Sequence, residues 1–153
     1  MEALSEEDLR SCCAVPAWAA PILAGQPWSD RAALLAAADA STRALSWEDV
    51  LIALAAHPRI GERAAGDSRE AGWSRQEQSA VRPDEALVAA NRAYEEKFGH
   101  VFLIFASGRG REEILAAAKQ RLGNDEETER EVVKDELRKI ALRRLERVLD
   151  ARG

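Results

Sequence analysis

The sequence lacks most of the features that mark a metalloprotein or a disulfide-stabilised protein. Its only cysteines, Cys12 and Cys13, are neighbours, and adjacent cysteines rarely bond to each other. Its two histidines, His57 and His100, lie far apart, and no Cys-x-x-Cys or His-Glu-x-x-His spacing occurs. We therefore expect reduced thiols and no metal site. Neither Gly-x-Gly-x-x-Gly nor a P-loop pattern is present, so we expect no nucleotide cofactor.

Basic blocks and long apolar runs are also missing. The net charge is −5, which argues against the basic face that nucleic-acid binding needs. No apolar run approaches the roughly 20 residues of a membrane span. The acidic first residues lack the basic and apolar regions of a signal peptide. We expect a cytoplasmic protein that binds neither nucleic acid nor a membrane.

Alanine, leucine and charged residues are abundant instead, and this composition favours helix over sheet. With 46% hydrophobic residues in 153, the chain can build one core. Capping residues and apolar spacing predict helices over residues 5–10, 29–42, 46–57, 74–81, 83–98, 111–122 and 126–149. Pro16 and Pro21 break up the stretch after the first helix. We expect an all-α fold, a single domain over residues 1–153 built as a bundle of seven or eight helices.

Two segments have no helical pattern. Residues 57–72 are polar and hold three glycines, and Pro58 disfavours helical backbone at His57. We predict a loop of about 15 residues here, a length that is usually functional or disordered. Residues 101–106 form a continuous apolar run, whose periodicity leaves a strand and a buried irregular segment equally open. A single strand cannot make a sheet, so neither alternative changes the fold class.

His57, Ser74 and Glu77 border this loop, and each has two interpretations. The imidazole of His57 suits proton transfer near neutral pH, or it simply ends a helix whose negative terminus favours its protonated form. Ser74 and Glu77 have the spacing of a capping box. Glu77 is alternatively an acid/base group, with Ser74 and Gln78 as hydrogen-bond partners.

Arg144 stands out by geometry alone. It lies four residues after Ile140 and four before Val148, near the centre of the apolar stripe of the last predicted helix, whereas Arg143 falls off that stripe. A guanidinium that faces the interior needs an anion or several acceptors. Arg144 is therefore either half of a buried ion pair or a clamp for an anionic ligand.

Several motifs together resemble one family. Residues 56–62 read Ala-His-Pro-Arg-Ile-Gly-Glu and residues 73–78 read Trp-Ser-Arg-Gln-Glu-Gln. Residues 94–99 (Tyr-Glu-Glu-Lys-Phe-Gly), 112–115 (Glu-Glu-Ile-Leu) and 121–124 (Arg-Leu-Gly-Asn) continue the match. Over about residues 9–149 the chain resembles the decarboxylases of 2-oxo-4-hydroxy-4-carboxy-5-ureidoimidazoline (OHCU). Many relatives have Phe-Pro where this chain has His100-Val101, which leaves open how residues 101–106 line a site.

The resemblance implies an all-helical, cofactor-free homodimer that converts its small-molecule substrate to (S)-allantoin during urate degradation. It implies that His57 and Glu77 are catalytic. Substrate binding falls to Pro58, Ser74, Gln78 and Arg144, and we add Phe102 and Ile104 through the backbone of residues 101–106. Two rival hypotheses are a non-catalytic helical adaptor that uses the 57–72 loop as its interaction surface and an enzyme of the same fold with a different ureido or hydroxy acid substrate.

Overall fold

The computed structural model describes residues 3–59, 69–78 and 85–152, and in these ranges the chain forms eight helices and no strand. The helices are α1 (Glu6–Cys12), α2 (Pro16–Ala24), α3 (Arg31–Arg43), α4 (Trp47–Leu54), α5 (Arg69–Glu77), α6 (Glu85–Phe98), α7 (Arg111–Leu122) and α8 (Glu126–Ala151). The predicted all-α class is confirmed. No helix in these ranges is long and apolar enough to cross a membrane.

Several helix ends follow the predicted capping chemistry. The Ser5 hydroxyl accepts from the Asp8 N–H while the Asp8 carboxylate accepts from the Ser5 N–H, which closes a capping box at α1. The Ser46 hydroxyl accepts from the Asp49 N–H at 3.2 Å at the start of α4. Gly99 follows α6 with a φ of 80°, a conformation that costs glycine little.

Other boundaries differ from the prediction. Residues 16–24 form α2, because Pro16 occupies its first turn, where the missing N–H has no helical partner anyway. Pro21 lies inside this helix, which is held in place by the burial of Trp18 and Ile22. Asp30, not Ser29, caps α3 by accepting from the Ala33 N–H at 2.8 Å. Helix α4 ends at Leu54, three residues before His57.

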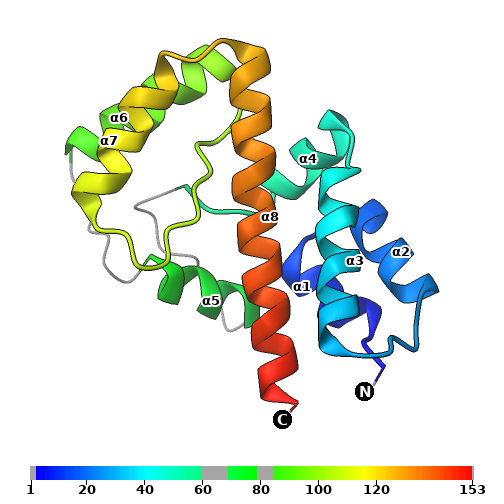
Figure 1. The fold of residues 1–153 in the computed structure, drawn as a ribbon. Helices are drawn as coiled ribbons and strands as arrows, with labels where there is room; N and C mark the ends of the chain where they lie inside the picture. Colours follow the sequence, from blue (N-terminus) through cyan, green and yellow to red (C-terminus); the bar gives the residue numbers. More distant parts are fainter. Residues whose placement is uncertain (1–2, 60–68, 79–84, 153) are drawn as a thin grey trace.

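The longest helix, α8, runs through the centre of the fold (Figure 1). Helices α1 to α4 lie on one side of it, and α5, α6 and α7 lie on the other. The main apolar cluster joins α1 to α4 with the buried stripe of α8, and a smaller cluster lies between α6 and α7. The site described below lies where these two clusters meet.

Residues 101–106 connect the two clusters without forming a helix or strand. Val101, Leu103 and Phe105 pack with the main cluster, whereas Phe102, Ile104 and Ala106 belong to the smaller one. This alternation with a period of two is that of an extended backbone. Because both faces are buried, every position is apolar, and this explains why the sequence pattern could not distinguish a strand from an irregular segment.

Candidate active site

A cavity opens where the chain after α4, the end of α5 and the 101–106 segment meet. Its volume is about 20 Å³, room for about one water molecule, so its walls are closely packed. It is lined by His57, Pro58, Ser74, Glu77, Gln78, Phe102, Leu103, Ile104, Ala106 and Ile140. The structure thus brings seven of the eight residues predicted for the site to one cavity. The eighth, Arg144, binds two of them.

Ser74 and Glu77 lie on α5, which begins at Arg69. Ser74 is therefore in the middle of this helix, and the predicted capping box between Ser74 and Glu77 is wrong. The predicted 57–72 loop is shortened at its end by α5, and its residues 60–68 lie outside the described residues, as do residues 79–84, where one helix was predicted to end and the next to begin. Residues three apart share a helix face, so Ser74 and Glu77 point the same way.

Arg144 of α8 is the common partner of both side chains. Its Nε donates to Glu77 Oε2 at 3.1 Å, and its Nη2 donates to Glu77 Oε1 and to Ser74 Oγ, both at 3.0 Å. Arg144, Glu77 and Ser74 are only 5%, 8% and 6% exposed. The predicted inward position of Arg144 is confirmed, and its partner is a carboxylate in a buried, two-point ion pair. Ligand binding by Arg144 stays a prediction.

His57 follows α4 and is half-buried, with its backbone N–H donating to the Leu54 carbonyl at 3.0 Å. Removal of the imidazole from water, and secondly the positive charge of Arg144, lower the pKa of His57 to about 3. The expectation that the helix terminus favours the protonated form is therefore wrong, because burial and Arg144 outweigh the partial charge of the helix end. The site therefore holds a neutral imidazole next to the Glu77–Arg144 pair.

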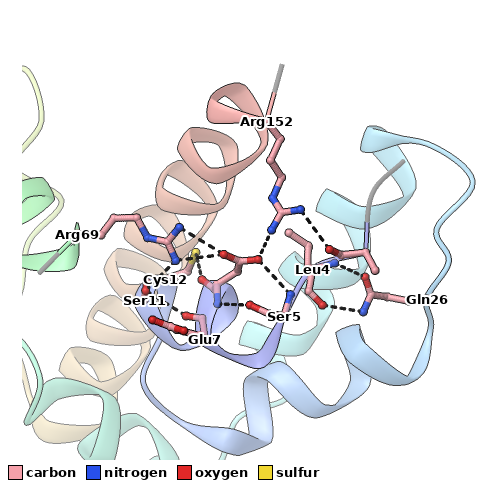
Figure 2. Close-up of polar contacts among 10 residues, drawn as sticks. Leu4, Ser5, Glu7, Ser11, Cys12, Gln26, Arg69 and Arg152 are labelled. Atoms are coloured by element: carbon pink, nitrogen blue, oxygen red, sulfur yellow. Dashed lines mark hydrogen bonds and ion pairs between the residues drawn. The ribbon is translucent and has the colours of Figure 1, made fainter.

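A second ion pair holds the start of α5. Arg69 donates to Asp8 Oδ1 at 3.3 Å and to Ser11 Oγ at 3.0 Å on α1. Figure 2 shows Arg152, which follows α8, donating to the same carboxylate from another direction. Burial raises the pKa of Asp8, but the Ser5 hydrogen bonds and the two arginines outweigh it and hold the pKa below its usual value. Helix α5 is thus tied to α1 at its start and to α8 near its end.

Two buried carboxylates of α8 were not among the residues predicted for the site. Glu129 is 1% exposed and Glu136 is 4% exposed. The spacing that identified Arg144 would have found both, because Glu129 lies four residues before Val133 and Glu136 lies four before Ile140. Neither lines the cavity, but both are connected to the 101–106 segment that forms one of its walls. Glu136 accepts from the Phe105 N–H, and Glu129 binds Arg121, which donates to the Leu103 carbonyl.

A metal site would need several ligating side chains close together. Within residues 3–59, 69–78 and 85–152, no three His, Cys, Asp or Glu side chains are grouped as a metal site would require. The cavity offers one imidazole and one carboxylate, and that carboxylate is bound to Arg144. These residues suit acid/base chemistry and the binding of an anion.

Comparison with known proteins gives a consistent family assignment. The family model described as OHCU decarboxylase matches residues 2–146. The chain is 30% identical over 148 residues to the uric acid degradation bifunctional protein TTL of Arabidopsis thaliana, covering 90% of this chain and 45% of that protein. It is 39% identical over 59 residues to the 2-oxo-4-hydroxy-4-carboxy-5-ureidoimidazoline decarboxylase of Amia calva, covering 39% of this chain and 34% of that protein. These matches span less than half the length of the curated relatives.

Solved structures agree with the sequence matches. The fold is similar to a crystal structure of OHCU decarboxylase in the presence of (S)-allantoin, with a TM-score of 0.78 and 28% identity over 95% of this chain and 99% of that one. An (S)-allantoin synthase structure has the same fold, with a TM-score of 0.64 and 24% identity over 91% of this chain and 47% of that one. On the family match over nearly its whole length, this chain belongs to the OHCU decarboxylase family.

Proposed function

We propose that this protein decarboxylates OHCU to (S)-allantoin. The observation that carries the proposal is that His57 and Glu77 line one small cavity, where Arg144 of the distant helix α8 holds Glu77. The relative crystallised in the presence of (S)-allantoin supports it, because that fold covers 95% of this chain. We also propose a cytoplasmic homodimer of a single domain, in line with the family resemblance and with the exposed apolar side chains Leu51, Ile52 and Val88.

The reaction needs a proton relay more than it needs a cofactor. One ring carbon of the substrate carries a carboxylate and a hydroxyl, and a C=N bond lies beside it. When CO2 leaves, the electrons of the broken C–C bond form a C=C bond, and the C=N electrons move to the nitrogen, which takes up a proton. The hydroxyl gives up its proton before the C–C bond breaks, its oxygen becomes the carbonyl of the product, and the neighbouring carbon gains a proton from one face. The ring itself is the electron sink.

We assign the transfer of the hydroxyl proton to His57. A neutral imidazole can accept that proton, but a pKa of about 3 is low for a base near neutral pH. The substrate carboxylate adds a negative charge close to the ring and offsets the charge of Arg144. Both effects raise the pKa of His57 once substrate is bound. The same imidazole then delivers the proton to the carbon, which makes the product a single enantiomer.

Arg144 and Glu77 act together in this scheme. Arg144 holds both Glu77 oxygens. An anionic or carbonyl oxygen of the substrate competes for the guanidinium, and a partly released Glu77 then shares the acid/base work with His57. Ser74 and Gln78 orient the ureido arm.

The 101–106 segment forms the opposite wall. Residues from both of its faces line the cavity, an arrangement that suits a ligand lying along one backbone edge of the segment. We propose that the backbone at Phe102 and Ile104 binds the ring carbonyl along this edge, with Pro58 packed beside His57.

The test follows circular dichroism while urate is oxidised in the presence of a hydroxyisourate hydrolase. Because the substrate decays spontaneously, the informative signal is rapid formation of optically active (S)-allantoin that depends on this protein. His57→Asn should keep the helical spectrum and lower turnover by about 10²- to 10⁴-fold, the usual worth of a general acid/base. Racemic product at the uncatalysed rate with the parent protein would reject the activity. Near-normal turnover by His57→Asn would reject only the role of His57. Size-exclusion chromatography with light scattering tests the homodimer.

A further inference from the structure

Three residues of the family motifs lie outside the cavity and gather around Glu129 of α8. Tyr94 of α6 donates its hydroxyl to Glu129 Oε2, and Asn124 Nδ2 donates to Oε1 at 3.1 Å. Arg121 of α7 donates to Oε2 through Nε at 2.9 Å and Nη2 at 2.6 Å. The Glu129 carboxylate is therefore fully paired, although its side chain is only 1% exposed. Burial first, and the hydrogen bond to Glu129 second, raise the pKa of Tyr94, so its hydroxyl stays protonated.

Arg121 joins this network to the wall of the cavity. Its remaining amino group, Nη1, donates to the Leu103 carbonyl at 2.7 Å. Its guanidinium also lies over the Phe102 ring at 4.5 Å from the centroid. Both Phe102 and Leu103 line the cavity. The guanidinium is planar and rigid, and Glu129 holds two of its nitrogens. The N–H groups of the third nitrogen, Nη1, therefore point in a fixed direction.

Glu136 of α8 holds the same segment two residues further along. Its Oε1 accepts from the Phe105 N–H at 3.2 Å, and its Oε2 binds Lys139 at 2.7 Å. Its side chain is 6% exposed. A buried backbone N–H without a partner is costly, and an extended segment normally finds its partner in a neighbouring strand. Here the hydrogen-bond partners are side chains instead: Arg121 of α7 for the Leu103 carbonyl and Glu136 of α8 for the Phe105 N–H.

In an extended chain, the carbonyl of one residue and the N–H two residues later point to the same edge. The Leu103 carbonyl and the Phe105 N–H therefore share the edge that Arg121 and Glu136 hold, which leaves the backbone groups of Phe102 and Ile104 on the other edge. We propose that Arg121 and Glu136 are positioning residues that fix the 101–106 wall of the active site. This inference rests on the proposed function for its kinetic test, but the geometry of the wall does not depend on it.

A pair of substitutions at Glu136 tests the inference. Glu136→Gln keeps an oxygen for the Phe105 N–H, whereas Glu136→Met removes it with little change in volume. Glu136→Met should raise KM and lower kcat/KM by about ten- to a hundredfold, the scale expected for a misplaced wall. Glu136→Gln should stay within about threefold of the parent, since a neutral acceptor still satisfies the N–H. Lys139→Met is the matched control, because it removes the ion pair and leaves the Phe105 bond intact.

Amide hydrogen exchange at Phe105 gives a second readout that needs no turnover. Glu136→Met should expose this N–H to exchange, and Glu136→Gln should keep it protected. If Glu136→Met does not fold, Arg121→Lys replaces it, because lysine can pair with Glu129 but cannot reach the Leu103 carbonyl at the same time. Equal kinetics and equal Phe105 exchange in Glu136→Met and the parent would overturn the inference. An equal loss of kcat/KM in Glu136→Met and Glu136→Gln would overturn it too. A parent without activity would reject the proposed function alone.

Discussion

Replacement of Arg144 by methionine is the most informative single change, because it separates stability from catalysis. The substitution keeps most of the side-chain volume and removes the guanidinium. It leaves the Glu77 carboxylate, 8% exposed, without its two hydrogen bonds from Arg144. A buried charge that loses its partner is strongly destabilising, whereas loss of both charges together is often close to neutral.

The expected magnitude follows from this burial. With side chains 6% and 8% exposed, solvent screens the pair little. Removal of one partner of such a pair costs about 3–5 kcal/mol, and in a domain of this size 1 kcal/mol shifts Tm by about 2–4 °C. We expect Arg144→Met to lower Tm by about 6–20 °C. Arg143→Met is the matched control, since Arg143 lies off the buried stripe, and it should stay within about 0.5 kcal/mol of the parent.

Thermal unfolding followed by circular dichroism, together with the (S)-allantoin assay, distinguishes the two roles. The double variant Arg144→Met/Glu77→Leu should recover most of the lost Tm and none of the lost turnover. A Tm for Arg144→Met within about 2 °C of the parent would refute the stability argument. Recovery of turnover in the double variant would refute the assignment of Arg144 and Glu77 to the active site.

Three further predictions concern other parts of the molecule. Because the pKa of His57 falls from 6.5 to about 3 on folding, the unfolded chain binds this proton first on acidification. Between pH 6.5 and pH 3 the parent should therefore lose stability faster than His57→Gln in urea titrations, and parallel curves would contradict the shift. Burial raises the pKa of Cys12 and Cys13 to about 12, so both thiols should react with a disulfide reagent at pH 8 only on unfolding; rapid native labelling would show that they are accessible. Arg69→Met should cost about 1 kcal/mol or less, because Arg69 is partly exposed, yet lower turnover by loosening α5. Arg10→Met, an exposed control on α1, should change neither, and equal turnover in the two variants would remove the anchoring role of Arg69.

Local chemistry in the sequence predicted the parts of the fold that depend on near neighbours. The capping box at Ser5, the start of α4 at Ser46 and the end of α6 at Gly99 each require contacts within a few residues. The inward position of Arg144 could also be predicted, because helical periodicity relates it to Ile140 and Val148 on the same helix.

Contacts between distant residues account for what the sequence did not reveal. The Ser74–Glu77 spacing suits a capping box, but α5 begins at Arg69, and both side chains instead bind Arg144, which is 67 residues from Glu77. The pKa of His57 depends on burial first and on that same arginine second. The extended form of residues 101–106 depends on α7 and α8, which follow it in the chain. Local patterns carry no information on such partners.

The contacts made by α8 constrain the number of residues between Glu129 and Arg144 as well as the identity of those residues. Glu129 and Glu136 are seven residues apart, and Arg144 follows eight residues later, so one helix carries the contacts of both cavity walls. Insertion of one residue between Glu136 and Arg144 would turn the arginine by about 100° and move it by about 1.5 Å along the axis. Insertion of seven would restore its direction to within about 20° but displace it by about 10 Å. Homologues that keep this site should therefore vary in the length of α8 only outside residues 129–144.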